Sequence, residues 1–595
     1  MTRGLECLLR VGVGGGFAAA NPHQKNVTNC HSERSEKSTL KIFPTNYFYR
    51  IAVFCKKIFQ HFTFSHCLIF ANLRPNYFLP DTIMLVKVYG SAIQGVDAIT
   101  ITVEVNIGKG VNFFLVGLAD SAVKESQQRI ESALTFNGFR LPGKKIVINM
   151  APADIRKEGS AYDLTIAMGV LAASEQIKSE NIEQYIIMGE LSLDGGLQPI
   201  RGALPIAIEA RNKGFKGFIL PAQNAREAAI VNDVNVYGVE NIKQVIDFFN
   251  GDKILEPTII DTRDEFYSSL NEYEFDFADV KGQENIKRAL EIAAAGGHNV
   301  ILIGPPGSGK TMLAKRLPSI LPPLNLHEAL ETTKIHSVAG RMQRETSLIS
   351  IRPFRSPHHT ISDVALVGGG QNPQPGEISL AHNGVLFLDE LPEFKRSVLE
   401  VMRQPIEDRV VTISRARFSV EYPASFMLIA AMNPCPCGYY NHPEMDCVCG
   451  PGIVQKYLNK ISGPLLDRID IHVEVTPVPF RELTEARTSE KSESVRKRVE
   501  KARLVQEERY NENKGIHCNA QMSSKLLRQI CKVDDAGHNL LKNAMEKLSL
   551  SARAYDRILK VSRTIADLDE SPDIKNEHLA EAIHYRSLDR ASWGV

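Results

Sequence analysis

The hydrophobic and polar positions of the chain predict an α+β unit over residues 84–250. Strict alternation over 98–106 predicts a strand with one face toward water. The other elements expected in this unit are strands at 113–118 and 145–150, an amphipathic helix at 121–136 and a buried helix at 161–173. The mixture of alternating and helical periods indicates a sheet covered by helices.

Further along the chain, apolar runs end repeatedly in polar residues, which predicts buried strands that present functional groups at their ends. These runs are 301–303 before a glycine-rich segment, 385–388 before Asp389 and Glu390, and 426–432 before Asn433, and Arg468 stands at the mouth of a last strand that ends at 475. After about residue 477 the pattern is helical, and Arg553 lies at the opening of one of these helices.

Length and composition are those of a multidomain globular protein. The 595 residues suggest three or four domains at about 150 residues each. With 43% hydrophobic and 23% charged residues, the chain can bury full cores. The net charge is only +1, so a contact with nucleic acid would have to come from local basic patches.

The first 83 residues differ from the rest. They contain 12 of the 43 aromatic residues and carry ten Lys and Arg against four Asp and Glu, with no sustained period. Two interpretations are open: a targeting or membrane-tethered extension, or translated upstream sequence with Met84 as the true start. Charged and polar residues break every apolar run before it reaches the about 18 residues of a membrane span. We therefore favour the second interpretation and expect poor order there.

The segment 301–311, Ile-Leu-Ile-Gly-Pro-Pro-Gly-Ser-Gly-Lys-Thr, fits the phosphate-binding loop pattern at every fixed position. Glycines let the backbone turn and direct N–H groups at phosphates, while the lysine charge and the threonine hydroxyl serve the outer phosphates and Mg²⁺. The predicted ATP-binding residues are Gly304, Pro305, Pro306, Gly307, Ser308, Gly309, Lys310 and Thr311.

Acidic and amide groups complete the predicted chemistry. We expect Asp389 to share the Mg²⁺ ion with Thr311, and we expect its strand to neighbour that of the phosphate loop. Glu390 would then polarise the attacking water, and Asn433 would touch the γ-phosphate or that water.

The order of these motifs resembles the AAA+ ATPases, in which 279–284 (Asp-Val-Lys-Gly-Gln-Glu) is similar to the adenine-side box. The segments 353–360, 365–370 and 375–382 resemble the magnesium-chelatase-like branch, and within it the YifB/ComM family of bacterial proteins. The resemblance covers about 84–595. It implies an ATP-driven hexameric motor of the cytoplasm, associated in the ComM case with DNA branch migration, and no membrane partner.

The resemblance also implies a domain plan and two arginine roles. A Lon-protease-like (S5-like) domain at 84–250 would be followed by a linker at 251–277, a parallel-sheet AAA+ core at 278–476 and a helical lid at 477–595. By the same resemblance, Arg468 would act as a finger in the neighbouring subunit's site and Arg553 would act from the lid.

Two rival functions follow from the same resemblances. The Lon-like domain suggests a Ser-Lys peptidase with Ser160 as nucleophile, but Tyr162 and Asp163 replace the small residues of the protease pattern. We expect Asp163 to start a helix instead. The other rival is a chelatase motor for metal insertion into a tetrapyrrole, which would need partner subunits that this chain does not contain.

The core carries an unpatterned insert over 337–374, rich in Gly, Pro, His and Arg. Such a stretch inside a compact domain is more often functional than not. Contacts in the central pore and a surface excursion at subunit contacts are both open. The candidate pore residues are Arg352, Arg355, His358 and His359.

A loop at 435–449 contains four cysteines, Cys435, Cys437, Cys447 and Cys449. Two Cys-x-Cys pairs can converge on a tetrahedral Zn²⁺ when the loop folds back, although a one-residue spacing is tighter than usual. His442 or Asp446 could replace one ligand. Structural zinc, free thiols and a redox switch are the three interpretations, whereas stable disulfides do not suit a cytosolic ATPase.

Overall fold

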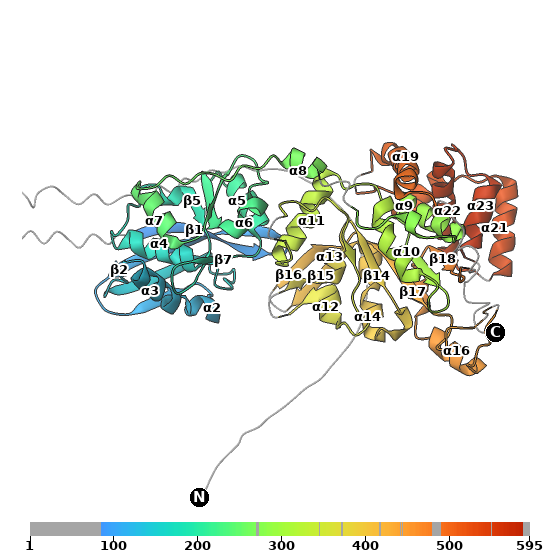
Figure 1. Cartoon of the computed structure of the whole chain (residues 1–595), viewed down its shortest axis with the longest axis horizontal. Helices are drawn as coiled ribbons and strands as arrows, with labels where there is room; N and C mark the ends of the chain where they lie inside the picture. The colour runs from blue at the N-terminus through green and yellow to red at the C-terminus, as the bar shows by residue number, and fades with distance from the viewer. Residues whose placement is uncertain are drawn as a thin grey trace, which may run out of the picture. The chain divides into compact units, whose positions relative to one another are not determined.

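The computed structural model describes residues 85–268, 273–343, 346–370, 373–415, 418–440, 442, 444–478, 489–513, 515–548 and 550–586 (Figure 1). The extension predicted over 1–83 lies outside these residues. None of the helices within the described ranges combines the length and apolar character needed to cross a membrane.

A seven-stranded mixed sheet forms the first folded region, in the order β3-β4-β2-β1-β5-β8-β9. β1 and β4 pair antiparallel with β2, and the remaining pairs are parallel. Buried and half-buried residues alternate along β2 and β4, as the sequence predicts. The strands of this region are β1 (Leu85–Gln94), β2 (Asp97–Gly108), β3 (Phe113–Val116), β4 (Lys145–Ala151), β5 (Tyr185–Ile187), β8 (Gly217–Pro221) and β9 (Asn235–Val239), with a separate hairpin of β6 (Glu190–Leu191) and β7 (Leu197–Gln198).

Helices pack on this sheet around one apolar core. Every residue of α4 is buried, in agreement with the expected buried helix. The single helix expected over 121–136 is instead two helices separated by Glu125. The helices are α2 (Ser121–Lys124), α3 (Ser126–Phe136), α4 (Asp163–Ala173), η2 (Ile182–Gln184), α5 (Ala203–Asn212), α6 (Ala222–Ala228) and α7 (Ile242–Asn250); α8 (Thr262–Ser268) then lies inside the predicted linker.

The second sheet is parallel, with the order β11-β14-β17-β10-β18. β14, which precedes Asp389, was expected beside β10, but β17 lies between them. Chain order does not fix strand order, because parallel connections can skip a strand. The strands are β10 (Val300–Ile303), β11 (Phe354–Arg355), β14 (Val385–Leu388), β17 (Met427–Met432) and β18 (Ile471–Glu474).

The insert over 337–374 is less irregular than the sequence suggests, because it contributes β11 to the edge of the second sheet. It also contains the helix α12 (Asp363–Val367) and the strand β12 (Gly368–Gly369), which pairs with β13 (Gln374–Pro375).

The other elements around this sheet are mostly helices. They are α9 (Glu284–Gly296), α10 (Lys310–Arg316), α11 (Leu326–Val338), α13 (Glu377–Leu380), α14 (Arg396–Val401), α15 (Arg403–Asp408), α16 (Pro451–Leu458) and α17 (Gly463–Leu466), with a hairpin of β15 (Val410–Arg415) and β16 (Phe418–Pro423). The 3-10 turns are η3 (Phe277–Asp279), η4 (Leu317–Ile320) and η5 (Leu391–Glu393).

The C-terminal region is helical, as predicted, and Figure 1 shows it in orange to red beside α9 and β18. Val495, Val499, Ala502 and Gln506 of α19 are buried, whereas Val505 is exposed. The helices are α19 (Ser492–Tyr510), η6 (Asn519–Gln521), α20 (Ser524–Ile530), α21 (Asp535–Lys547), α22 (Ala552–Leu568) and α23 (Asn576–His584).

Candidate ATP site and cysteine cluster

The phosphate loop connects β10 to α10 and is held from two sides. Gly304 N donates to Met432 O at 3.2 Å, and a Cβ on Gly304 would lie 2.2 Å from Val475 O, so only glycine fits there. Gln283 Nε2, from the segment predicted to be the adenine-side box, donates to Ser308 O at 2.8 Å. Sequence analysis assigns no role to this glutamine side chain.

Lys310 lies at the centre of the loop. Its Nζ donates to Gly304 O and Pro305 O at 2.8 Å each and to Asn433 Oδ1 at 3.2 Å. Burial lowers the pKa of the Lys310 ammonium, and the nearby Asp389 carboxylate opposes this shift. The structure therefore brings together the lysine of the loop and the amide at the end of β17.

Thr311 and Asp389 form the second cluster of the site. Thr311 Oγ1 donates to Asp389 Oδ2 at 2.6 Å, although 78 positions separate them in the chain. A hydroxyl and a carboxylate oxygen in contact are the donor types that Mg²⁺ prefers. The residues therefore fit the metal that the sequence analysis assigned to them.

Glu390 is exposed and lies at the start of the 3-10 turn η5, with a left-handed φ of 53°. Its Oε2 lies 3.3 Å from Nδ1 of His359. The His359 ring also packs on the His358 ring, with centroids 4.1 Å apart. Sequence reasoning placed His359 among pore candidates and missed its contact with Glu390. No local signal could reveal that contact, because 31 positions separate the two residues.

The two arginines assigned by resemblance lie in different settings. Arg468 is 6% exposed, pairs with Glu407 at 2.8 Å and donates to Pro464 O at 2.6 Å. Arg553 is exposed in the first turn of α22. Within the described ranges, neither arginine has a hydrogen bond or an ion pair to residues 304–311.

Two arginines of the insert are engaged inside the molecule. Arg352 pairs with Glu328 at 3.1 Å and also donates to backbone carbonyls, and Arg355 forms a two-pronged ion pair with Glu377 at 2.6 and 2.8 Å. Both arginine side chains therefore attach the insert to the rest of the AAA+ core. The pore role suggested for them is not supported by this geometry.

The four cysteines of the 435–449 loop converge. Their sulfur atoms all lie within 4.8 Å of one another, and Cys435 Sγ is 3.2 Å from Cys437 Sγ and 3.7 Å from Cys447 Sγ. Zn–S bonds of about 2.3 Å in a tetrahedron place sulfurs about 3.8 Å apart. The spacing therefore suits a metal ion.

His442, proposed as a substitute ligand, instead accepts the N–H groups of Glu444 and Met445 at 3.1 Å each. Asp446 is exposed and lies outside the sulfur cluster. Burial would raise the pKa of the Cys437 thiol, but backbone and thiol hydrogen bonds lower that pKa to about 6. Thiolate is the form that binds metal.

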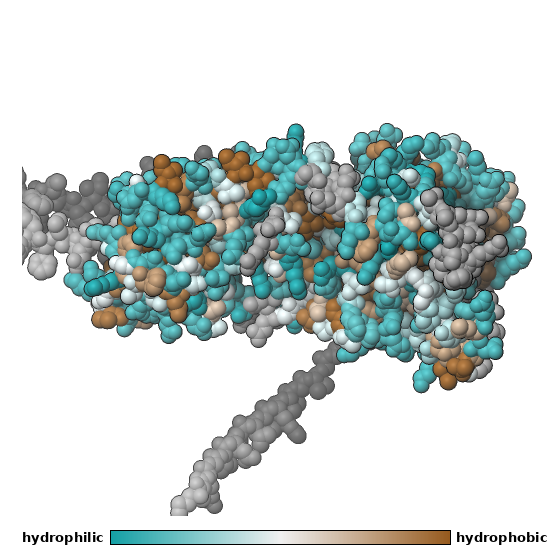
Figure 2. All heavy atoms as spheres, viewed as in Figure 1, coloured by the Kyte–Doolittle hydropathy of each residue, from teal (hydrophilic) through white to brown (hydrophobic). Residues whose placement is uncertain are grey.

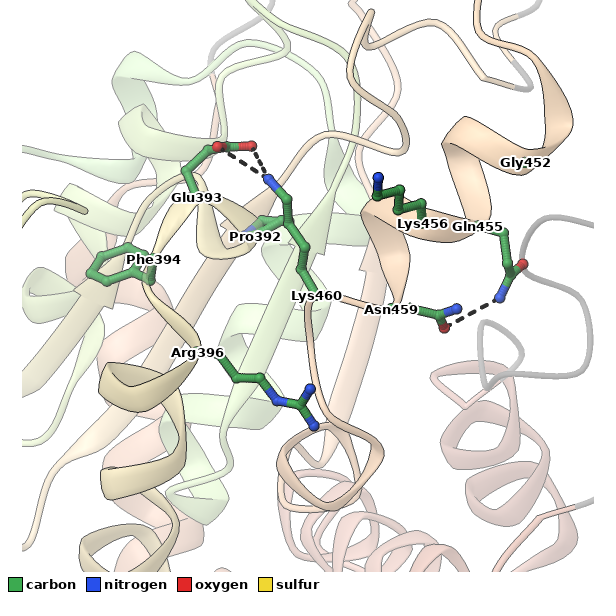
Figure 3. Close-up of a pocket in the computed structure, with 9 residues that line it drawn as sticks. All are labelled: Pro392, Glu393, Phe394, Arg396, Gly452, Gln455, Lys456, Asn459 and Lys460. Atoms are coloured by element: carbon green, nitrogen blue, oxygen red, sulfur yellow. Dashed lines mark hydrogen bonds and ion pairs between the residues drawn. The ribbon is translucent and has the colours of Figure 1, made fainter.

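An open cleft of about 750 Å³ lies between the segment after Glu390 and α16 (Figure 3). Lys460 Nζ reaches across it to Glu393, at 3.1 and 3.3 Å from the two carboxylate oxygens. The cleft is lined by Pro392, Glu393, Phe394, Arg396, Gly452, Gln455, Lys456, Asn459 and Lys460. Figure 2 shows apolar spheres near α16, where Met445, Val448 and Ile453 are exposed.

The candidate nucleophile Ser160 is engaged with an acidic partner, because its Oγ contacts the Glu190 carboxylate. Lys157, the lysine three positions before it, is buried and donates to Pro152 O. Asp163 begins α4, as expected, and binds Arg129 at 2.6 and 2.9 Å. These contacts favour a structural role for the region.

Comparisons with known proteins agree with this geometry. The family described as "Magnesium chelatase, subunit ChlI" matches residues 276–483, "Subunit ChlI of Mg-chelatase" matches 103–224, and "Magnesium chelatase, subunit ChlI C-terminal" matches 489–586. The chain is 45% identical over 510 residues to "Competence protein ComM" of Haemophilus influenzae, covering 85% of this chain and 98% of that protein. It is also 45% identical over 512 residues to YifB of Escherichia coli, covering 84% and 97%. A weaker match, 31% over 185 residues, joins it to "Lon protease 2" of Bacillus subtilis, covering 27% and 33%.

The parallel sheet, the phosphate loop and the Thr311–Asp389 pair define an ATP-binding AAA+ protein of the magnesium-chelatase-like type. With identity of this level over nearly the whole length of its relatives, the chain belongs to the YifB/ComM family.

Proposed function

We propose that this protein is a ring-forming motor that hydrolyses ATP and uses the energy to move or remodel DNA, as in branch migration. The observation that supports ATP hydrolysis is the convergence of Lys310, Thr311, Asp389 and Asn433 at the strand ends of one parallel sheet. The similarity to a competence protein supports DNA as the polymer. We place this activity in the cytoplasm, in a hexamer of identical chains.

Each residue has one task in this proposal. The loop amides and Lys310 bind the phosphates, and Thr311 and Asp389 hold Mg²⁺, which would offset phosphate charge. Glu390 takes up the proton of the attacking water, and Asn433 senses the γ-phosphate through the position it shares with Lys310. Arg468 serves the neighbouring subunit's site and Arg553 acts from the lid.

A chelatase motor is the second candidate, because the family descriptions name magnesium chelatase. A peptidase is the third, supported by the Lon similarity and opposed by the contacts of Ser160 and Lys157. Purified protein should be assayed for ATP turnover with forked DNA, linear duplex, porphyrin with Mg²⁺, and casein, with Lys310→Ala as the control for contaminating ATPases.

We expect forked or branched DNA to raise turnover several-fold over linear duplex, while porphyrin and casein leave it unchanged. Stimulation by porphyrin alone would transfer the proposal to the chelatase class. Casein cleavage that survives in Lys310→Ala and disappears in Ser160→Ala would support the peptidase.

We also propose that the four cysteines hold a structural Zn²⁺ ion. The support is the sulfur geometry, since all four ligand atoms lie within 4.8 Å of one another. Elemental analysis of protein purified without chelator should give about one zinc per chain, as expected for a closed four-thiolate site. A Cys447→Ser, Cys449→Ser variant should lose it, whereas Cys518→Ser, at a buried cysteine outside the cluster, should keep it.

A further inference from the structure

The cysteine loop begins directly at the ATP site. Cys435 follows Asn433 by two positions, and Asn433 Oδ1 accepts a hydrogen bond from Lys310 at 3.2 Å. Cys435 itself is fully buried. Two residues of backbone therefore connect the sulfur cluster to the amide that contacts the phosphate-loop lysine.

The middle of the loop touches the phosphate loop. Gly438 is buried with φ at 88°, and a Cβ placed on it would lie 2.4 Å from Pro306 Cδ and 2.8 Å from Pro306 Cγ. Pro306 is one of the residues between β10 and Lys310. The turn at Gly438 therefore packs on the phosphate loop at a distance that only glycine allows.

The far end of the loop returns to the site as well. Cys449 is followed within two residues by α16, and Lys460, just beyond that helix, pairs with Glu393. Glu393 ends the 3-10 turn that starts after Glu390 (Figure 3). One end of the cysteine loop is thus two residues from Asn433, and the other is connected through the Lys460–Glu393 pair to the turn that follows Glu390.

The sulfur cluster joins the two halves of a loop that has no regular secondary structure in its described residues, although several of these residues also pack on the core. Among the described residues between Asn433 and Gly450, no helix or strand is present. Within the described part of the loop, Cys447 Sγ contacts Cys435 Sγ and Cys437 Sγ across its two halves, at 3.7 and 3.5 Å. A bound metal would turn these weak thiol contacts into four bonds.

We propose that the metal-bound cysteine loop packs against the ATP site and holds it in its binding conformation, so that Zn²⁺ and ATP bind cooperatively. This inference rests on the proposed zinc site and on the proposed ATP site. Metal binding fixes Gly438 against Pro306 and fixes Asn433 near Lys310, which orders the phosphate loop before nucleotide arrives. Because coupling between sites is reciprocal, bound nucleotide must tighten metal binding by the same factor.

The test measures both affinities in one protein. The affinity for a non-hydrolysable ATP analogue with Mg²⁺ is measured for zinc-loaded protein and for protein stripped with chelator and dialysed. We expect stripping to weaken nucleotide binding by at least about 5-fold, the lower end of typical coupling between sites. Co²⁺ is then titrated into stripped protein, with its thiolate absorption bands as the readout. The analogue should raise the Co²⁺ affinity by the factor that separates the nucleotide affinities of Co²⁺-loaded and stripped protein.

Three variants separate the steps. Gly438→Ala keeps all four sulfurs, so it should bind one metal yet bind the analogue more weakly than wild type does, because its Cβ pushes the loop away from Pro306. Lys310→Ala should bind metal normally and lose the effect of the analogue on Co²⁺ affinity. Cys518→Ser is the matched cysteine control and should retain both affinities and their coupling.

Several results would overturn the inference, and they differ from one another. Zinc-free wild-type protein whose sulfurs do not take up Co²⁺ would refute the metal site. Zinc-loaded protein that binds no nucleotide would refute the ATP site. Normal binding of both ligands, with affinities that change less than about 2-fold in each other's presence, would refute the coupling alone. Circular dichroism shows whether the stripped protein is still folded. If it is unfolded, the coupling is tested by comparing the nucleotide affinities of metal-loaded Gly438→Ala and metal-loaded wild type.

Discussion

At the residue scale, the ATP site separates groups that bind from the group that reacts. Lys310, Thr311 and Asp389 contact each other or the loop backbone, whereas Glu390 is exposed and touches none of them by side chain. This separation predicts that binding and hydrolysis can be disabled independently.

Glu390→Gln keeps the size of the side chain and removes its charge. We expect ATP turnover to fall by about 10²- to 10⁴-fold, as is typical for the loss of a general base, with nucleotide affinity nearly unchanged. Glu393→Gln, three positions further and paired with Lys460, is the matched carboxylate control and should keep most of the turnover. Turnover and nucleotide affinity are measured side by side. Wild-type turnover in Glu390→Gln would move the base to another carboxylate.

The contact between His359 and Glu390 leads to a second prediction at this scale. The imidazole competes with water for the carboxylate, because Nδ1 lies 3.3 Å from Oε2. We expect His359→Ala to raise basal ATP turnover severalfold and to reduce the further stimulation by branched DNA. His358→Ala is the control, since His358 Nδ1 contacts Thr360 instead. Unchanged basal turnover in His359→Ala would show that the contact has no role in positioning Glu390.

At the element scale, a buried ion pair joins the C-terminal helix α22 to the residue before β18. Arg557 Nη1 lies 2.8 Å from Asp470 Oδ1, and Asp470 is 1% exposed. Asp470 Oδ2 accepts Asn299 N at 3.0 Å. Burial alone would raise the pKa of the Asp470 carboxyl, but Arg557 and His298 hold it well below its ordinary range.

Arg557→Ala should therefore lower the free energy of unfolding by about 3 to 5 kcal/mol, because it removes the arginine charge that offsets a buried carboxylate. Arg553→Ala, on the exposed face of the same helix, should change it by less than about 0.5 kcal/mol. Urea unfolding followed by circular dichroism gives both values. Equal effects of the two substitutions would contradict the assigned role of the pair.

The same pair predicts a pH dependence. A carboxyl whose pKa is lower in the folded state stabilises the fold above its unfolded pKa of about 3.9, and that contribution is lost as the pH falls toward the folded pKa. Wild type should therefore lose stability relative to Asp470→Asn below about pH 4, and the difference between them should be constant from pH 5 to pH 7. A difference that grows between pH 5 and pH 7 would assign the effect to another group.

At the scale of the whole molecule, the proposed finger Arg468 needs a second subunit. In one chain Arg468 is buried and paired with Glu407, so it does not reach the chain's own phosphate loop. We expect Arg468→Ala to bind ATP and lose turnover as a pure ring. Mixed rings with Lys310→Ala subunits, which carry an intact arginine, should regain part of the turnover.

Size-exclusion chromatography must show that the mixed rings assemble, and thermal unfolding must show that Arg468→Ala folds, because removing Arg468 leaves Glu407 unpaired. Assembled mixed rings without any recovered turnover would rule out the action of Arg468 across subunits. Arg468→Lys is the conservative variant, and partial turnover in its pure ring would point to charge as the property that matters.

Sequence alone determined much of this protein. The phosphate loop and the apolar runs before Asp389 and Asn433 were readable because a buried strand followed by polar residues is a local pattern. The buried helix α4 and the helical C-terminal region were predicted for the same reason. The fold class and the family followed from the order of these motifs.

The tertiary structure alone decided which distant residues meet. β17 lies between β10 and β14, β11 comes from an insert without visible period, and His359 reaches Glu390 across 31 positions. Gly438 packs on Pro306, and Arg352 and Arg355 turn inward to glutamates. None of these contacts has a local sequence pattern. Each partner is selected by the packing of the folded chain, which the hydrophobic periodicity of a single segment does not reveal.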